Sequence, residues 1–198
     1  DDNGLAIRFG AANSGAIIDS LAWGKAQNTF IEGLVFPTNP GVNQSLKRKL
    51  NLDTNNNSID FFIQAHPDPK NSSATIVAPT SPPVETSAAS STPTQASSEN
   101  TATSTSETIN SLIPPLRGGI KNTLGDVVIN ELVSDPTDNE VEWVELYNKS
   151  GREIDLSGWW LEEGSGAKTK LNGVLMGSGA ERYKVIEQPA GNLNSQCC

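Results

Sequence analysis

The chain has 198 residues, with 14 basic and 23 acidic side chains and a formal net charge of −9, so it is acidic and has room for one or two small domains. Its longest basic cluster is Lys47-Arg48-Lys49, which is a poor basis for gripping phosphate backbones, and we expect no nucleic-acid partner. No apolar run approaches the ~18 residues of a membrane-spanning helix, and we expect no membrane span.

Residues 1–70 predict short β-strands separated by turns. Apolar and polar residues alternate or form short apolar runs, and Gly, Pro and Asn occupy the breaks. The expected strands are residues 5–9, 16–24, 44–50 and 59–65. The prolines in residues 32–41 predict a loop, and residues 26–34 have room for one turn of helix at most.

The middle of the chain predicts a linker. Half of residues 71–108 are Ser or Thr, and no aromatic residue occurs between Phe62 and Trp143. Such a stretch cannot bury enough apolar surface to offset its conformational entropy. Residues 109–124 are less polar, but their Pro-Pro and Gly-Gly pairs argue against a helix or a central strand. We therefore expect a Ser/Thr/Pro-rich disordered linker over residues 71–124.

Residues 125–198 again predict strands without a helical period. The expected strands are residues 126–132, 141–148, 167–171 and 182–188, with Trp159 and Trp160 on a further one. Many short strands at even spacing indicate an all-β sandwich or barrel. The only cysteines, Cys197 and Cys198, are adjacent, so they provide neither a disulfide framework nor metal-ligand spacing.

Two glutamates of these strands stand among apolar neighbours. Strand alternation places Glu145 on the face of Trp143, and Glu131 on the face of Ile129. A buried carboxylate needs donors or it takes up a proton. Glu131 and Glu145 are therefore either structural anchors bonded to backbone or basic groups, or members of a site. Because no other site chemistry accompanies them, we favour the anchors.

The stretch VVINELVSDPTDNEVEWVELYNKSGREIDLSGWWLEE, which begins at Val127, resembles the opening half of a lamin-tail domain, and RYKVIEQPAGNLN resembles the next strand. This resemblance implies an immunoglobulin-like β-sandwich. Residues 1–70, with GLAIRFGAANSGAIIDSLAWG and DTNNNSIDFF, resemble the closing half. The expected organisation is thus a closing half (1–70), a linker (71–124) and an opening half (125–198), as in a fragment of a tandem array.

The two halves are complementary. We predict that they pack together as one circularly permuted sandwich, because each alone would leave an uncovered apolar face and open sheet edges. Trp23 and Trp143 should then share one core, and the former junction between Asn194 and Asp2 should supply two chain ends that lie close together. The acidic second half should also meet the Lys47-Arg48-Lys49 cluster.

The family resemblance implies a non-catalytic extracellular or cell-surface interaction or architectural module. It implies a protein or polysaccharide ligand, tandem copies of the domain in the parent protein, and no cofactor. The alternative is a calcium- or carbohydrate-binding accessory module of a secreted surface hydrolase. We expect no enzyme activity, because the single histidine, His66, stands beside the linker with no marked nucleophile near it in the sequence.

Weak calcium candidates occur in two acidic loops. They are Asp53, Asn55, Asn57 and Asp60 in one loop, and Asp135, Asp138, Glu140 and Glu142 in the other. The first loop departs from the calcium pattern, since Ser58 replaces a glycine and Gln64 replaces the bidentate glutamate. Solvated loops are the competing interpretation. Trp159 and Trp160 face opposite sides of their strand, so one belongs to the core and the other is a possible surface contact.

Overall fold

The structure is a computed structural model, and it describes residues 3–12, 14–50, 52–70 and 125–194. The predicted linker (71–124), the predicted approach of the chain ends at Asp2, and the cysteine pair lie outside the described residues. No helix among the described residues is long and apolar enough to cross a membrane.

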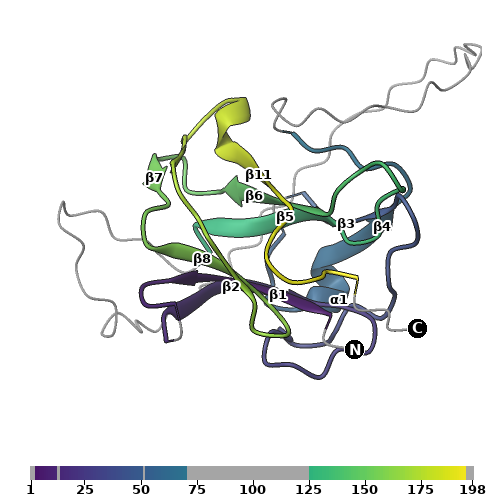
Figure 1. Cartoon of the computed structure of the whole chain (residues 1–198). Helices are drawn as coiled ribbons and strands as arrows, with labels where there is room; N and C mark the ends of the chain where they lie inside the picture. The colour runs from purple at the N-terminus through teal and green to yellow at the C-terminus, as the bar shows by residue number, and fades with distance from the viewer. Residues whose placement is uncertain (1–2, 13, 51, 71–124, 195–198) are drawn as a thin grey trace, which may run out of the picture. The chain divides into compact units, whose positions relative to one another are not determined.

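The fold is an all-β, immunoglobulin-like sandwich of two antiparallel sheets (Figure 1). The first sheet has the order β2-β1-β8-β9, with bounds Ala16–Ala22, Gly4–Phe9, Trp159–Glu163 and Lys168–Lys170. The second has the order β11-β6-β5-β3-β4, with bounds Tyr183–Glu187, Trp143–Asn148, Val127–Val133, Ser45–Arg48 and Phe61–Gln64. A small third ribbon pairs β10 (Val174–Leu175) with β7 (Ile154–Asp155).

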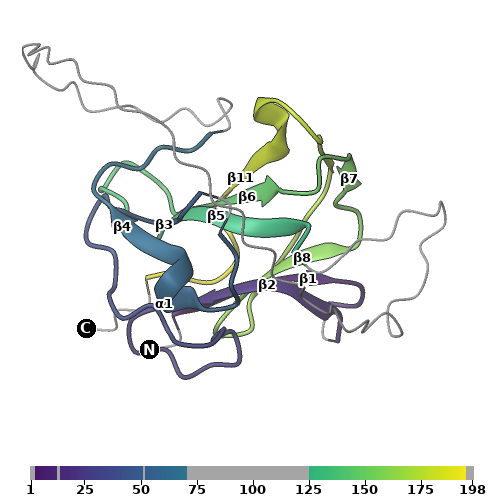
Figure 2. The ribbon, with the colours of Figure 1, turned by 180° about the vertical axis from the view of Figure 1, so that it is seen from behind.

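The two segments on either side of the linker contribute to both sheets. In the first sheet β1 pairs with β8 from Leu5↔Glu163 to Phe9↔Trp159. In the second sheet β3 pairs with β5 through Lys47↔Glu131 and its neighbour. Figures 1 and 2 show the same interleaving, with the purple and blue strands lying beside the green and teal ones. The predicted packing of the two segments is confirmed.

One hydrophobic core fills the space between the sheets, and both segments supply it. Trp23, Phe61, Ile129 and Trp159 are among its largest members. The prediction that Trp143 shares this core with Trp23 is wrong. Alternation along β6 turns Val144 and Leu146 into the core and places Trp143 on the opposite face, where it is buried apart from the core cluster.

A β-bulge corrects the predicted faces of β5. The register between β5 and β6 shifts between Ile129 and Glu131, so Asn130 is the extra residue. Ile129 and Leu132 therefore both enter the core, although strict alternation would separate them. The prediction that Glu131 shares the face of Ile129 is wrong. Glu131 turns to the outer face of the sheet with Glu145, its register partner.

Short helices appear where none was expected. The loop that contains the first calcium candidates folds into α1 (Asn57–Asp60), which packs beside β4 in Figure 2. A single turn of 3₁₀ helix, Ala180–Arg182, precedes β11. Residues 26–34, the predicted helical turn, form a loop. Residues 32–41 are also loop, as predicted, apart from an isolated bridge between Phe36 and Trp23.

Candidate functional site

Glu131 is fully buried and holds the chain after β4. Its Oε1 accepts hydrogen bonds from the Ser45 hydroxyl at 2.6 Å, the Gln64 amide at 3.2 Å and the Asp68 backbone N–H at 3.0 Å. Its Oε2 lies 2.9 Å from the Lys47 ammonium. The acidic second segment thus meets the predicted basic cluster through this ion pair.

Glu145 is also fully buried. Its Oε1 accepts a hydrogen bond of 2.6 Å from the Lys70 backbone N–H, and its Oε2 accepts one of 2.7 Å from the side-chain amide of Asn130. The bulge residue therefore supplies a donor to the neighbouring strand. Both glutamates bind backbone, amide or basic groups, which is the environment of a structural carboxylate. Their role as anchors stays a prediction.

A buried ion pair joins the two sheets. Nη2 of Arg48 donates to both carboxylate oxygens of Asp19 at 2.8 Å, and each side chain is 1% exposed. The Asp19 carboxylate also accepts the Ile129 N–H at 2.7 Å, while Nε of Arg48 donates to the Ile129 carbonyl at 2.8 Å. These two side chains thus satisfy the Ile129 backbone at the bulge, where β3 has no residue paired with it.

Three acids lie close together around this ion pair. One oxygen each from Asp19, Glu32 and Asp53 lies within 4.8 Å of the others, the one such group of three in the described part of the chain. Burial raises the pKa of Asp19 to about 6, and burial followed by the charge of Asp19 raises the pKa of Glu32 to about 7. The guanidinium of Arg48 supplies a positive charge inside this group, since it also lies 3.7 Å from Asp53.

In the first candidate calcium loop, the side chains of Asp60 and Asn57 are hydrogen-bonded to other groups of the protein. The Asp60 carboxylate accepts hydrogen bonds from the Thr54 N–H at 2.8 Å and the Thr54 hydroxyl at 2.7 Å. Asn57 is fully buried: its Oδ1 accepts from the Ala22 N–H and its Nδ2 donates to the Ser20 carbonyl, both at 3.0 Å. Neither side chain is directed outward, and Asp53 faces Arg48 and Lys149 instead.

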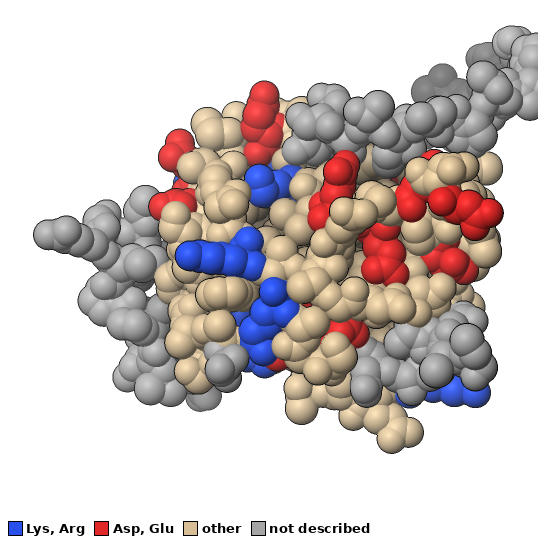
Figure 3. Space-filling model, viewed as in Figure 1, with Lys and Arg blue, Asp and Glu red and all other residues tan. Residues whose placement is uncertain are grey.

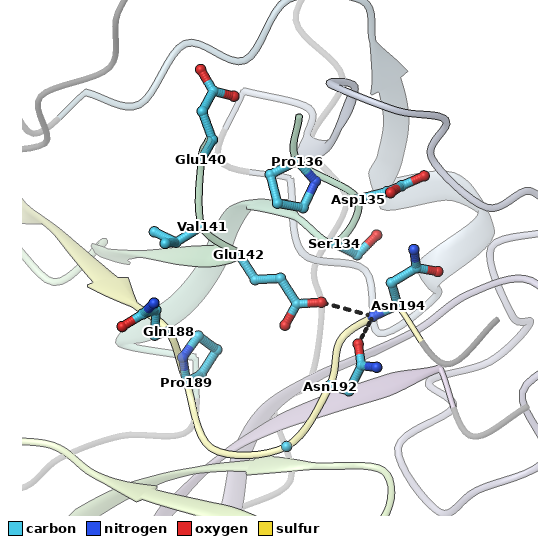
Figure 4. Close-up of a pocket in the computed structure, with 11 residues that line it drawn as sticks. Ser134, Asp135, Pro136, Glu140, Val141, Glu142, Gln188, Pro189, Asn192 and Asn194 are labelled. Carbon is cyan, nitrogen blue, oxygen red and sulfur yellow. Dashed lines mark hydrogen bonds between the residues drawn. The ribbon is translucent and has the colours of Figure 1, made fainter. Parts of the chain in front are cut away.

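A surface pocket of about 460 Å³ lies between the loop that joins β5 to β6 and the segment that follows β11 (Figure 4). Its lining is polar and includes no Lys, Arg, His or aromatic residue. The lining residues are Ser134, Asp135, Pro136, Glu140, Val141, Glu142, Gln188, Pro189, Gly191, Asn192 and Asn194. Figure 3 shows Asp and Glu side chains gathered on one side of this view and Lys and Arg mainly on the other.

Glu142 fastens the two walls of the pocket together. Its carboxylate accepts hydrogen bonds of 3.1 Å from the backbone N–H groups of Leu193 and Asn194, and its carbonyl accepts the Gln188 N–H at 2.9 Å (Figure 4). Burial raises the pKa of the Glu142 carboxyl and outweighs the lowering by these two donors. Leu193 belongs to the hydrophobic core, so the segment after β11 is held both by the Glu142 hydrogen bonds and by the packing of Leu193.

Comparison with known proteins gave one match. Residues 121–192 match the family model of the Lamin Tail Domain. This segment is similar to a lamin tail domain. No curated protein and no solved structure matched the chain.

The matched lamin tail domain segment includes β5, β6, β7, β8, β9, β10 and β11. It therefore contains the whole pocket lining except Asn194. The family is one of non-catalytic, immunoglobulin-like domains. The matched residues do not extend to 1–70, so the interpretation of that segment as a closing half, and of the chain as circularly permuted, stays a prediction.

The structure separates the two tryptophans of the lamin tail segment. Trp159 is fully buried in the core against Phe9, at 5.4 Å between ring centroids, and it is not a surface contact, because strand alternation turns it inward. Trp160 is half-buried and donates its Nε1–H to the Gly10 carbonyl at 3.2 Å. Trp160 thus remains partly exposed to solvent. His66 is exposed, as expected.

Sequence reasoning noticed part of the pocket and missed the rest. Asp135 lines it, whereas Asp138 is exposed and outside the lining. Glu142 was one acid among several in its loop, and nothing in the sequence pairs it with residues 51 and 52 positions later. Asp19 and Arg48 were missed for the same reason, since their contact spans 29 positions.

Proposed function

We propose that the chain is a non-catalytic interaction or architectural module of an extracellular or cell-surface protein. The supporting observation is that some acidic side chains are bonded inside the fold while others line a surface pocket. The fully buried carboxylates Glu131, Glu145 and Asp60 are bonded to protein donors that hold strands and loops together, whereas the acids Asp135 and Glu140 line an open surface pocket. Such a pocket recognises a partner without supplying a nucleophile and a base in contact.

The similarity of residues 121–192 to a non-catalytic family supports the same proposal. The test measures adsorption of the labelled full chain to whole cells together with turnover of peptide, ester and glycoside substrates. We expect saturable adsorption that unlabelled chain competes away, and no turnover. Turnover that is lost in Glu142→Gln would contradict the proposal, because this residue would then act on a substrate.

A calcium- or carbohydrate-binding accessory module of a surface hydrolase is the second candidate. The close oxygens of Asp19, Glu32 and Asp53 favour calcium, although Arg48 already occupies their centre. A ligand that binds only the native state at a hundred times its Kd adds ~2.7 kcal/mol to stability. A calcium titration of the melting temperature therefore separates the two functions: a saturable rise supports this candidate, and a flat response supports the first.

A further inference from the structure

The pocket beside β6 contains acceptors that the protein leaves without donors. Among the described residues, neither Asp135 nor Glu140 makes a side-chain hydrogen bond or ion pair, although both line the pocket. No basic residue lies in the lining to offset their charge. Glu142 adds a third carboxylate, which Figure 4 shows between the other lining residues. The pocket therefore carries an uncompensated negative charge.

The Ser134 hydroxyl gives a second, independent indication of a ligand. Ser134 is 3% exposed and lines the pocket, and its hydroxyl has no hydrogen-bond partner among the described residues. Its oxygen is not one of the fully enclosed side-chain atoms that lack a partner, so a group that enters the pocket can reach it. On the facing wall Gln188 adopts φ 46°, a left-handed conformation that is uncommon outside glycine and that concentrates at functional sites.

The arrangement of the acceptors decides which class of ligand fits. Asp135, Glu140 and Glu142 do not form a group whose oxygens lie within 4.8 Å of one another, so they are too far apart to ligate a single metal ion. No aromatic residue lines the pocket, so the stacking surface on which a sugar ring rests is missing. A guanidinium group spreads five N–H donors over three nitrogens, an ammonium group carries three on one nitrogen, and either brings the missing positive charge.

We propose that this pocket binds the cationic side chain of a partner peptide, an arginine or a lysine. The carboxylates of Asp135 and Glu140 receive its N–H donors at the rim, and the Ser134 hydroxyl and the Glu142 carboxylate receive them below. Burial is the main cause that raises the pKa of Glu142, and the charges of Glu163 and Asp135 add to it, so a bound cation offsets part of that repulsion. This inference rests on the proposed interaction function and names its ligand chemistry.

The test uses the full chain and a fluorescent peptide probe, acetyl-Gly-Arg-Gly-Arg-Gly-amide, at about 0.15 M salt, where distant surface charges are screened. Fluorescence anisotropy gives affinity, and amide chemical shifts give the location. We expect shifts at residues 134–142 and 188–194, and no binding of the probe with Gln in place of Arg. Asp135→Asn/Glu140→Gln should weaken binding about tenfold or more, the size expected for hydrogen bonds to charged groups.

A matched pair controls for net charge. Glu153 and Glu181 are exposed and outside the lining, so Glu153→Gln/Glu181→Gln removes the same two charges and should leave affinity unchanged. Ser134→Ala keeps the net charge and should weaken binding without lowering the melting temperature. Equal losses in both charge pairs, shifts centred elsewhere, or equal affinity for the Gln probe would overturn the inference.

Failure of this inference is distinguishable from failure of the proposed function. If the chain adsorbs to cells but calcium ions or a neutral oligosaccharide shift these amides while the Arg probe does not, the cationic ligand is wrong and the interaction module stands. Substrate turnover that depends on Glu142 would remove the proposed function whether or not the probe binds.

Discussion

Glu131 and Glu145 are direct register partners on β5 and β6, and neither side chain is exposed to solvent. Like charges placed opposite each other destabilise a sheet unless each is compensated. The Lys47 ammonium lies 2.9 Å from Glu131, and the Asp68 N–H donates to it, while the Lys70 N–H donates to Glu145. The two acids thus fix the chain after β4 across the centre of the second sheet.

Replacing either glutamate should therefore destabilise the fold. Glu131→Ala removes the carboxylate nearest to the Lys47 ammonium and leaves the Asp68 N–H without its acceptor, and Glu145→Ala leaves the Lys70 N–H without its acceptor. Each change should lower the free energy of unfolding by ~1–3 kcal/mol, measured by chemical denaturation. Glu153→Ala, at an exposed position, is the control. Parent-like stability of both variants would show that the carboxylates are not anchors.

Replacing only one residue of the Asp19–Arg48 pair should lower the free energy of unfolding more than expected from the effect of replacing both. Asp19→Ala removes the bidentate partner of the buried Arg48 guanidinium and leaves the Ile129 N–H without its acceptor, so it should cost ~3–5 kcal/mol. Arg48→Met leaves a buried carboxylate and should cost a similar amount. Because the double variant removes both uncompensated charges, it should lose less than the sum of the single variants, by ~0.5–3 kcal/mol in a double-mutant cycle. Additive losses would mean that the two side chains act independently.

Glu32 should make stability depend on pH. Its pKa rises from 4.5 to about 7 on folding, chiefly because the carboxyl is buried and then because Asp19 is negative. The folded state therefore holds more protons than the unfolded state in this window. Stability from this group is fully present below pH 4.5 and is lost as pH rises through about 7.

The variant Glu32→Gln isolates that contribution. The difference in free energy of unfolding between parent and variant should fall steadily across pH 4.5 to 7 and be constant below it. Denaturant titrations at a series of pH values measure this difference. A difference that is flat across the whole range would place the folded-state pKa of Glu32 at its ordinary value.

Asn57 substitutes for a neighbouring strand at the edge of the first sheet. Its side-chain amide bonds the Ala22 N–H and the Ser20 carbonyl, so β2 does not present these groups to another chain. Asn57→Ala should lower stability by ~1–3 kcal/mol and speed hydrogen exchange at the Ala22 amide. The neighbouring Asn56→Ala should change stability by less than ~0.5 kcal/mol. Unchanged exchange at Ala22 in Asn57→Ala would refute this role.

The circular permutation predicts that the order of the segments can be exchanged. A Cβ added at Gly191 would lie 2.8 Å from a Glu163 carboxylate oxygen, and Leu5 is the register partner of Glu163, so the two ends of the described sandwich lie near each other (Figures 1 and 2). A chain that runs from residue 125 to 194 and continues through a short Gly-Ser join into residues 3–70 should keep the fold. Amide chemical shifts of the core should match those of the parent. A reordered chain that stays unfolded would contradict the permutation.

Strand positions followed from the sequence because they depend on local pattern. Alternation and turn residues located β1 and β2, β3 and β4, and β5 and β6 to within a few residues, and they placed Trp159 and Trp160 on opposite faces of their strand. The same pattern indicated that Glu145 would stand among apolar neighbours. Such features depend on residues two to four positions apart, which the sequence displays directly.

Tertiary structure decided what those strands face. The bulge at Asn130 moved Glu131 to another face, and a strict period of two has no place for an extra residue. Asn57, Asp19 and Glu142 found their partners 29 or more positions away, where local pattern carries no information. The sequence determined the many short strands of a β-sandwich, because strands depend on local alternation. The packing of strands from both segments decided which acids are bonded to protein donors and which line the surface pocket, because those contacts join residues far apart in the sequence.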